Sequence, residues 1–232
     1  MKIVSIDLSS NTGIAYFDTE QQDYLVDCFD YTIERATPMT LNRTQKLSED
    51  QLVKKSKRKR TLEKYDSSKH PNDFLFYVDD YIEGLIKEIN SRKWVFDYIV
   101  IEQTNKGRDR WKQKLLEWLH YKLCYRVFYY KDLFGGVEIK YIDTMEWRKI
   151  LGIKVSKEDK RANRKIRIHN KEVKVSGEKR ITGIIKDKDM AIEFCEKEFG
   201  LSMSRKDNNI ADAMCIGYGY LLKNKFIKNE DL

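Results

Sequence analysis

Proline and glycine, the residues that most often interrupt regular structure, are scarce in this chain, and long apolar runs are missing. Only 2 of the 232 residues are proline and 11 are glycine, which excludes collagen-like and low-complexity proteins. No run of about 18 apolar residues occurs, so we expect no segment that crosses a membrane. The first residues, MKIVSIDLSSNTG, also lack an apolar run of signal-peptide length.

Cysteine and histidine are too few and too scattered for a disulfide framework or a zinc site. The sequence has four cysteines and three histidines, no CxxC pair occurs, and the histidines do not cluster with Cys28, Cys124, Cys195 or Cys215. This distribution predicts four buried, reduced thiols in a cytoplasmic protein.

The composition predicts one folded domain over residues 1–232. Hydrophobic residues make up 41% of the chain and aromatic residues 12%, which is enough to bury a core and excludes a wholly disordered chain. The length fits one large domain or two small ones, and the scarcity of glycine and proline favours one.

Positive charge is concentrated in two segments, a basic loop at about residues 40–70 and a basic insertion at about residues 154–186. Residues 54–60 carry six Lys or Arg and no acid, and residues 154–180 carry eleven Lys or Arg against four acids. The formal net charge is +8, so the rest of the chain is slightly acidic. One such segment is ordinarily a solvated loop, but two favour a polyanion such as nucleic acid.

Apolar patterns predict five strands and at least five helices. We expect strands at 2–7, 14–17, 24–33, 97–102 and 137–142, and helices at 74–89, 110–127, 145–151, 188–199 and 208–222. Residues 37–70 are expected to form an irregular connection, and the alternation over 165–175 predicts a basic hairpin. Strand–helix–strand units favour parallel pairing in an α/β fold.

Three acids occupy positions where a carboxylate is costly unless it is paired or bound to a cation. Asp7 and Glu102 each end an apolar strand, and Asp212 lies among small and apolar residues of the last helix. If the two strands are parallel neighbours, their ends lie about 5 Å apart. Oxygen ligands without His or Cys favour Mg²⁺ or Mn²⁺, and two such ions could hydrolyse a phosphodiester. Taken singly, a strand-end acid is more often only a cap or the partner of a lysine; the joint pattern is much more specific than its parts.

Four short motifs in this order resemble the RuvC-type Holliday junction resolvases of the ribonuclease H-like superfamily, with the phage-encoded branch nearest. They are IVSIDLSSNTGIA at 3–15, YIVIE at 98–102, WRKILG at 147–152 and NIADA at 209–213. The resemblance implies a mixed five-stranded sheet flanked by helices on both faces. It also implies a homodimer in the cytosol of a bacterium or of a phage-infected host. This dimer would cut four-way or branched DNA with two Mg²⁺ or Mn²⁺ ions per active site and no small-molecule cofactor.

The resemblance also assigns an acidic tetrad, from which this sequence departs. Asp7, Glu102 and Asp212 match three of its acids, but Asn209 stands three residues before Asp212 where the fourth is usual. Asn209 can ligate a metal through its carbonyl oxygen without adding charge. Asp207 either supplies that charge or only caps the last helix, and both alternatives stay open.

A second departure follows Glu102, where such families often have an aromatic wedge. The first aromatic here is Trp111, which the helical apolar pattern assigns to the core. Lys106, Arg108 and Arg110, which lie between Glu102 and Trp111, are better placed to contact phosphates beside the metal ions. With the two basic segments, the proposed DNA-binding residues are Lys54, Lys55, Lys57, Arg58, Lys59, Arg60, Lys106, Arg108, Arg110, Arg161, Arg164, Lys165 and Arg167.

Other functions remain as alternatives. A non-catalytic junction-binding module fits the loss of the fourth acid, and a transposase-like nuclease of the same fold would carry the same acids. An actin-like kinase also begins with a strand-end Asp and a Ser/Thr/Gly turn. It would need a second glycine-rich phosphate loop, for which this chain offers only poor candidates.

Overall fold

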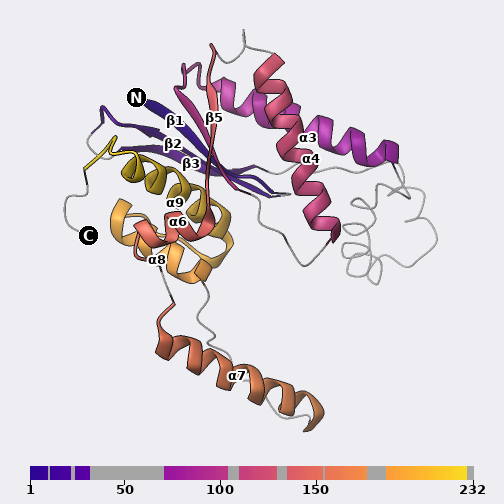
Figure 1. The fold of residues 1–232 in the computed structure, drawn as a ribbon, viewed down its shortest axis with the longest axis vertical. Coiled ribbons are helices and arrows are strands. Elements are labelled where there is room, and N and C mark those ends of the chain that lie inside the picture. The colour runs from indigo at the N-terminus through magenta and orange to yellow at the C-terminus, as the bar shows by residue number, and fades with distance from the viewer. Residues whose placement is uncertain are drawn as a thin grey trace.

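Five strands form one mixed sheet in the order β3-β2-β1-β4-β5 (Figure 1). The computed structural model describes residues 1–9, 11–21, 24–31, 71–103, 110–129, 135–153, 155–176 and 187–228, with backbone alone at 71–74, 110–112, 171–176 and 187–188. The strands are β1 (Lys2–Asp7), β2 (Thr12–Asp18), β3 (Leu25–Tyr31), β4 (Tyr98–Glu102) and β5 (Glu138–Ile142). The pairs β1–β2 and β2–β3 are antiparallel, whereas β1–β4 and β4–β5 are parallel. The predicted fold class is confirmed.

Helices cover both faces of this sheet (Figure 1). One core lies between the sheet and the helices α3 (Pro71–Ser91) and α4 (Arg110–Tyr129). The other core lies beneath α6 (Thr144–Ile150), α8 (Asp187–Phe199) and α9 (Asn208–Lys223), the last preceded by a short 3₁₀ helix, η1 (Arg205–Asp207). Because both faces are covered, the central strands are apolar almost throughout, as the sequence pattern indicated.

One prediction of secondary structure is wrong. Residues 165–175, expected to form a hairpin, belong to the helix α7 (Lys157–Ser176). Its start is capped, since the Ser156 hydroxyl accepts a hydrogen bond of 2.9 Å from the Asp159 backbone N–H. Lys, Arg, Glu and Ala, which favour helices, make up much of α7, and the predicted turn Asn170-Lys171 lacks the glycine that a tight hairpin requires.

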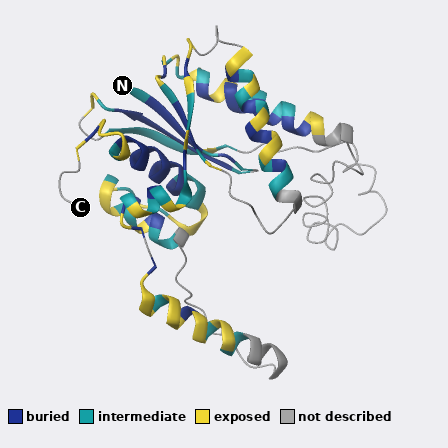
Figure 2. Ribbon diagram, in the orientation of Figure 1, coloured by how far each residue is buried: buried dark blue, intermediate teal, exposed yellow. Residues whose placement is uncertain are grey.

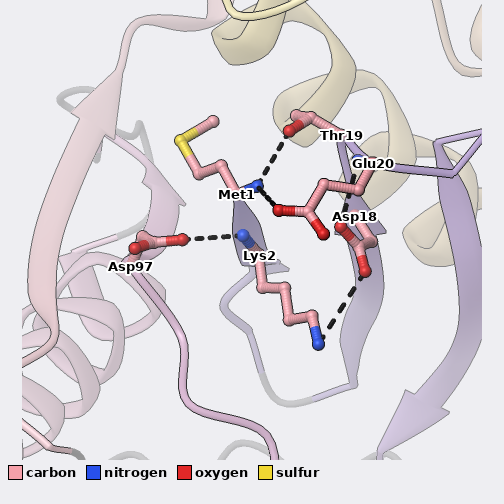
Figure 3. A network of polar contacts seen from close by, with 6 residues as sticks. All are labelled: Met1, Lys2, Asp18, Thr19, Glu20 and Asp97. Carbon is pink, nitrogen blue, oxygen red and sulfur yellow. Dashed lines mark hydrogen bonds and ion pairs between the residues drawn. The ribbon is translucent and has the colours of Figure 1, made fainter.

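The register of β1 is supported at its first residues by a polar network (Figure 3). The Lys2 backbone N–H donates to the Asp97 carboxylate at 2.7 Å, next to the start of β4. The Met1 amino group donates to the Thr19 hydroxyl at 2.9 Å, just beyond the end of β2. A slip of one residue would turn every β1 side chain to the opposite face, so these contacts help to fix the register of β1 at its N-terminal end, against β4 on one side and β2 on the other.

The cysteines are free thiols, as expected, but only two are buried. Cys195 of α8 and Cys215 of α9 lie in the same core with their sulfurs 3.7 Å apart, and burial raises the pKa of Cys215 well above its usual value. Cys28 and Cys124 are half-buried, so the prediction of four buried thiols is wrong for these two.

Within the described residues, no helix combines the length and the apolar character that crossing a membrane requires. The predicted irregular connection at 37–70 lies outside the described part of the chain.

Candidate active site

Asp7 and Glu102 end neighbouring parallel strands. In the β1–β4 pair, Ile6 lies opposite Ile101, so the next residue of each strand is one of the two acids. Adjacent strands are about 4.8 Å apart, which gives the backbone separation at this edge of the sheet. Both residues are half-buried. The juxtaposition expected for the two strand ends is therefore present.

The pleat directs both acids to the face that α9 covers. Two residues before Asp7, the Ser5 hydroxyl donates to the Ala213 carbonyl of α9 at 2.7 Å. Two residues before Glu102, Val100 packs in the core beneath the same helix. Side chains two positions apart in a strand share a face, so Asp7 and Glu102 point to the side on which α9 lies.

The start of α9 rests on the strand beside Asp7. Gly13 pairs with Asp7 across β1 and β2, and a Cβ added to Gly13 would lie 1.9 Å from the Asn209 carbonyl oxygen. Only glycine permits this approach. Asp212, three residues after Asn209 and on the same side of the helix, is buried with 6% of its surface exposed. The third predicted acid therefore lies on the helix that covers the first two.

Thr144 is a site residue that sequence reasoning missed. Its hydroxyl donates a hydrogen bond to Oε1 of Glu102 from the first residue of α6. Asp143 caps that helix by accepting the Met145 backbone N–H at 2.7 Å, which leaves the Thr144 hydroxyl for Glu102. The signal was available, because Thr144 follows β5 at the same edge of the sheet as the two acids.

The Asp207 carboxylate turns back toward Ser204. It accepts the Ser204 backbone N–H at 2.7 Å and the Ser204 hydroxyl at 2.8 Å, forming the capping box of η1. These hydrogen bonds lower the pKa of Asp207, and the bond from the Ser204 backbone N–H has the larger effect. The contacts thus support a capping role, although the helix capped is η1 and not α9. Its role as a fourth ligand stays a prediction.

The donor chemistry suits a hard cation, but the side chains are not gathered around one point. Asp7, Glu102, Asp212 and Asn209 offer oxygen ligands alone, the set that Mg²⁺ and Mn²⁺ prefer. Among the described residues, however, no group of three or more His, Cys, Asp or Glu side chains could hold a metal ion. The backbone brings the predicted acids to one region, and their shared metal stays a prediction.

Comparisons with known proteins identify the fold. Neither the models of known protein families nor the curated protein sequences contain a match to this chain. Among solved structures, RuvC of Thermus thermophilus in complex with a Holliday junction substrate superposes with a TM-score of 0.53 at 10% identity, over 97% of this chain and 96% of that one. A second T. thermophilus RuvC structure gives 0.52 at 12% identity with the same coverage. The fold is RuvC-like.

At such identities the similarity establishes the fold alone. The yeast mitochondrial Holliday junction resolvase Ydc2 gives a TM-score of 0.47 at 13% identity, over 94% of this chain and 77% of that one, too low to add to the assignment. The nearness of the phage-encoded branch stays a prediction.

The predicted DNA-binding residues fall into three groups. Eight lie outside the described residues: Lys54, Lys55, Lys57, Arg58, Lys59, Arg60, Lys106 and Arg108. Arg110 is described by its backbone alone at the start of α4, as is Trp111, whose predicted place in the core stays a prediction. The remaining four are exposed on α7: Arg161, Arg164, Lys165 and Arg167.

Proposed function

We propose that this chain is a metal-dependent endonuclease that cuts four-way or other branched DNA. The observation that carries the proposal is the pair Asp7 and Glu102, which end adjacent parallel strands and face the helix bearing Asp212. A solved structure of similar fold contains a Holliday junction substrate. We also propose that 1–232 is one nuclease domain and that it acts in the cytoplasm.

Asp7, Glu102, Asp212 and Asn209 would hold the divalent ions, with Asp207 as a further candidate. Two bound ions would supply positive charge to the attacking and leaving oxygens of the phosphodiester. Asp212 is buried in α9, so its carboxylate is poorly solvated and gains from a nearby cation. The Thr144 hydroxyl holds one oxygen of Glu102 and thereby orients its carboxylate.

Replacement of Asp7 by Asn tests this function. Asp7→Asn keeps the size of the side chain and removes its charge, so the protein should bind a four-way junction without nicking it in Mg²⁺. Glu193→Gln, at an exposed position on α8, removes one carboxylate away from the site and should nick normally. Nicking by Asp7→Asn at the wild-type rate would refute the assignment.

A non-catalytic junction-binding module is the second candidate. It is favoured by Asn209 in place of an acid and by the absence, among the described residues, of three grouped acids. It predicts junction binding without cleavage at any Mg²⁺ or Mn²⁺ concentration, which a titration with end-labelled strands decides. The same assay on three-way, flap and linear substrates separates a resolvase from a transposase-like nuclease.

We further propose that the protein is a homodimer that pairs through α4. One side of this helix packs in the core through Leu115, Leu119 and Leu123. Another side carries an exposed aromatic stripe with neighbouring ring centroids 4.4 to 6.4 Å apart. Its members are Trp118, Tyr121, Tyr125, Phe128 and Tyr129, which are 38% to 65% exposed.

The area and charge of this stripe favour a second copy over DNA. Five rings of about 200 Å² each, roughly half exposed, offer about 500 Å² of aromatic surface, a large share of the roughly 800 Å² per partner in a standard interface. The adjacent cations Lys122 and Arg126 form ion pairs with Asp79 and Glu83 of α3, so they add little free charge for phosphate. Two active sites, one per copy, would also suit the cutting of two strands.

A further inference from the structure

Helix α7 presents a continuous cationic face. Six of its residues between 157 and 167 are exposed Lys or Arg. At 100° per residue they occupy an arc of about 160° around the helix axis. We call this surface the cationic face of α7; it comprises Lys157, Lys160, Arg161, Arg164, Lys165 and Arg167.

The opposite side of α7 is the covered one. Asn163 is buried, and Asp159, Ile166 and Asn170 are half-buried. The helix itself lies apart from the sheet and from the other labelled helices, and most of its described surface is exposed (Figures 1 and 2). The cationic face is therefore turned to solvent.

The chain just before α7 is anchored in the body of the protein. Ile153 and Val155, just before the helix, are both buried, and Ile153 packs in the core beneath α9. The Ser156 cap begins the helix directly after them. Glu158 and Asp159 in the first turn also stabilise this end through the helix dipole, so the cations of the following turns lie on a helix with a well-defined start.

We infer that the cationic face of α7 binds the phosphate backbone of a DNA duplex arm, outside the cleavage site and without reading its bases. Naming the duplex as an arm of the cleaved substrate rests on the proposed function. Residues 157–167 span about 15 Å of helix, a length over which duplex DNA carries roughly nine phosphate charges. The face contains no Asn, Gln, Asp or Glu among its cations, and Ile168 is the one exposed apolar residue beside them.

A membrane surface fits this helix less well than DNA. Amphipathic helices that bind lipid carry a broad face of large apolar residues opposite their charges. Between 157 and 170 the only such residues of α7 are Ile166 and Ile168, and they lie on different sides of the helix. The charge pattern therefore favours DNA, a polyanion that offers no apolar layer for a helix to enter, over an anionic membrane.

The triple variant Lys160→Gln, Arg164→Gln and Arg167→Gln tests the inference in the full chain. Its affinity for a four-way junction and for a linear duplex of one arm is measured in EDTA, so that no cutting occurs, from 50 to 300 mM salt. We expect affinity to fall roughly tenfold or more at 100 mM salt for both probes. The slope of log affinity against log salt should flatten by about 2 to 3, since each lost phosphate contact removes about 0.9.

The matched control removes the same charge from the body of the protein. Lys87, Lys197 and Lys228 are exposed on or near α3, α8 and the end of α9, and their replacement by Gln should leave affinity within about threefold. The exchange Lys160→Arg, Arg164→Lys and Arg167→Lys should preserve affinity and the indifference to arm sequence. Far-UV circular dichroism of each variant checks that α7 remains helical.

Three results would overturn the inference: an unchanged salt slope in the triple Gln variant, an equal loss in the control, or a loss confined to one arm sequence. A fourth result would assign the face to membranes. In it, the wild type binds vesicles of neutral and anionic phosphatidyl lipids, and the triple Gln variant loses this vesicle binding but keeps its affinity for the duplex. Because binding is read in EDTA, a protein that binds through α7 but never nicks in Mg²⁺ would refute the nuclease proposal and leave this inference standing.

Discussion

Gly13 and Asn209 approach so closely that no side chain fits between β2 and the first turn of α9. A Cβ on Gly13 would lie 1.9 Å from the Asn209 carbonyl oxygen, a backbone atom that cannot move without the helix. Gly13 also pairs with Asp7. This contact sets the height of α9, and hence of Asp212, above the strand-end acids.

Gly13→Ala should therefore destabilise the fold and disrupt the site together. We expect the free energy of unfolding to fall by about 3 kcal/mol, because α9 must shift away from the sheet. Gly152→Ala is the control: its Cβ would meet nothing within 4 Å, so it carries only the strain of a φ of +67°, about 1 kcal/mol. Urea denaturation of both variants measures the difference, and equal losses would contradict the argument.

Thr144→Val should impair the site without unfolding the protein. Valine keeps the shape of the side chain but cannot donate to Glu102, so that carboxylate loses one orienting contact. Removal of such a supporting group typically costs 10- to 100-fold in metal affinity or activity. We expect the nicking rate to fall about tenfold and the Mg²⁺ requirement to rise. Thr144→Ser retains the hydroxyl and should remain close to wild type, so a loss as large as that of Val would exclude the proposed role.

The part of the site that could be predicted is the part that depends on strand ends. Continuous apolar runs identify β1 and β4 because both strands are buried on both faces, and an acid at the end of such a run is conspicuous. Thr144 carries no charge and follows β5, which mixes polar and apolar residues, so this rule does not find it; only its place at the same edge of the sheet does. By contrast, the Gly13–Asn209 contact joins segments almost 200 residues apart, and no local pattern announces it.

One error and one ambiguity arose where one pattern serves two structures. The alternation at 165–175 also fits a helix, and the deciding feature, the Ser156 cap, lies nine residues earlier. In α4, a repeat at helical spacing includes Leu115, Trp118 and Leu119, which the sequence alone does not divide between two sides of the helix. The helix has two apolar sides, and Trp118 lies on the exposed one. Hydrophobicity alone cannot separate a core from an interface, because each buries apolar surface.

Polar replacement within the aromatic stripe should yield a monomer. Tyr121→Ser, Phe128→Ser and Tyr129→Ser remove its three most exposed rings, so they should weaken self-association while changing the stability of the fold little. Sedimentation equilibrium measures the mass, and end-labelled junctions show whether paired cuts become single nicks. Met145→Ser, at a 73% exposed position on α6, is the control and should leave the dimer intact. A wild-type protein that is already monomeric at micromolar concentration would contradict the dimer proposal.

His120 should make the protein less stable in mild acid. The His120 ring is buried and stacks on Tyr141, with the two ring centroids 5.9 Å apart. Burial lowers the pKa of His120 from 6.5 to about 4. The unfolded chain takes up a proton near pH 6.5 and the folded chain does so only near pH 4, so stability falls as the pH drops through that interval. The loss attributable to His120 is about 2 kcal/mol between pH 7 and pH 5. His120→Phe keeps a stacked ring that cannot take up a proton. Between pH 7 and pH 5, the free energy of unfolding of this variant, measured in urea, should therefore fall by about 2 kcal/mol less than that of the wild type. An identical pH dependence in both proteins would mean that the folded protein accommodates a charged His120.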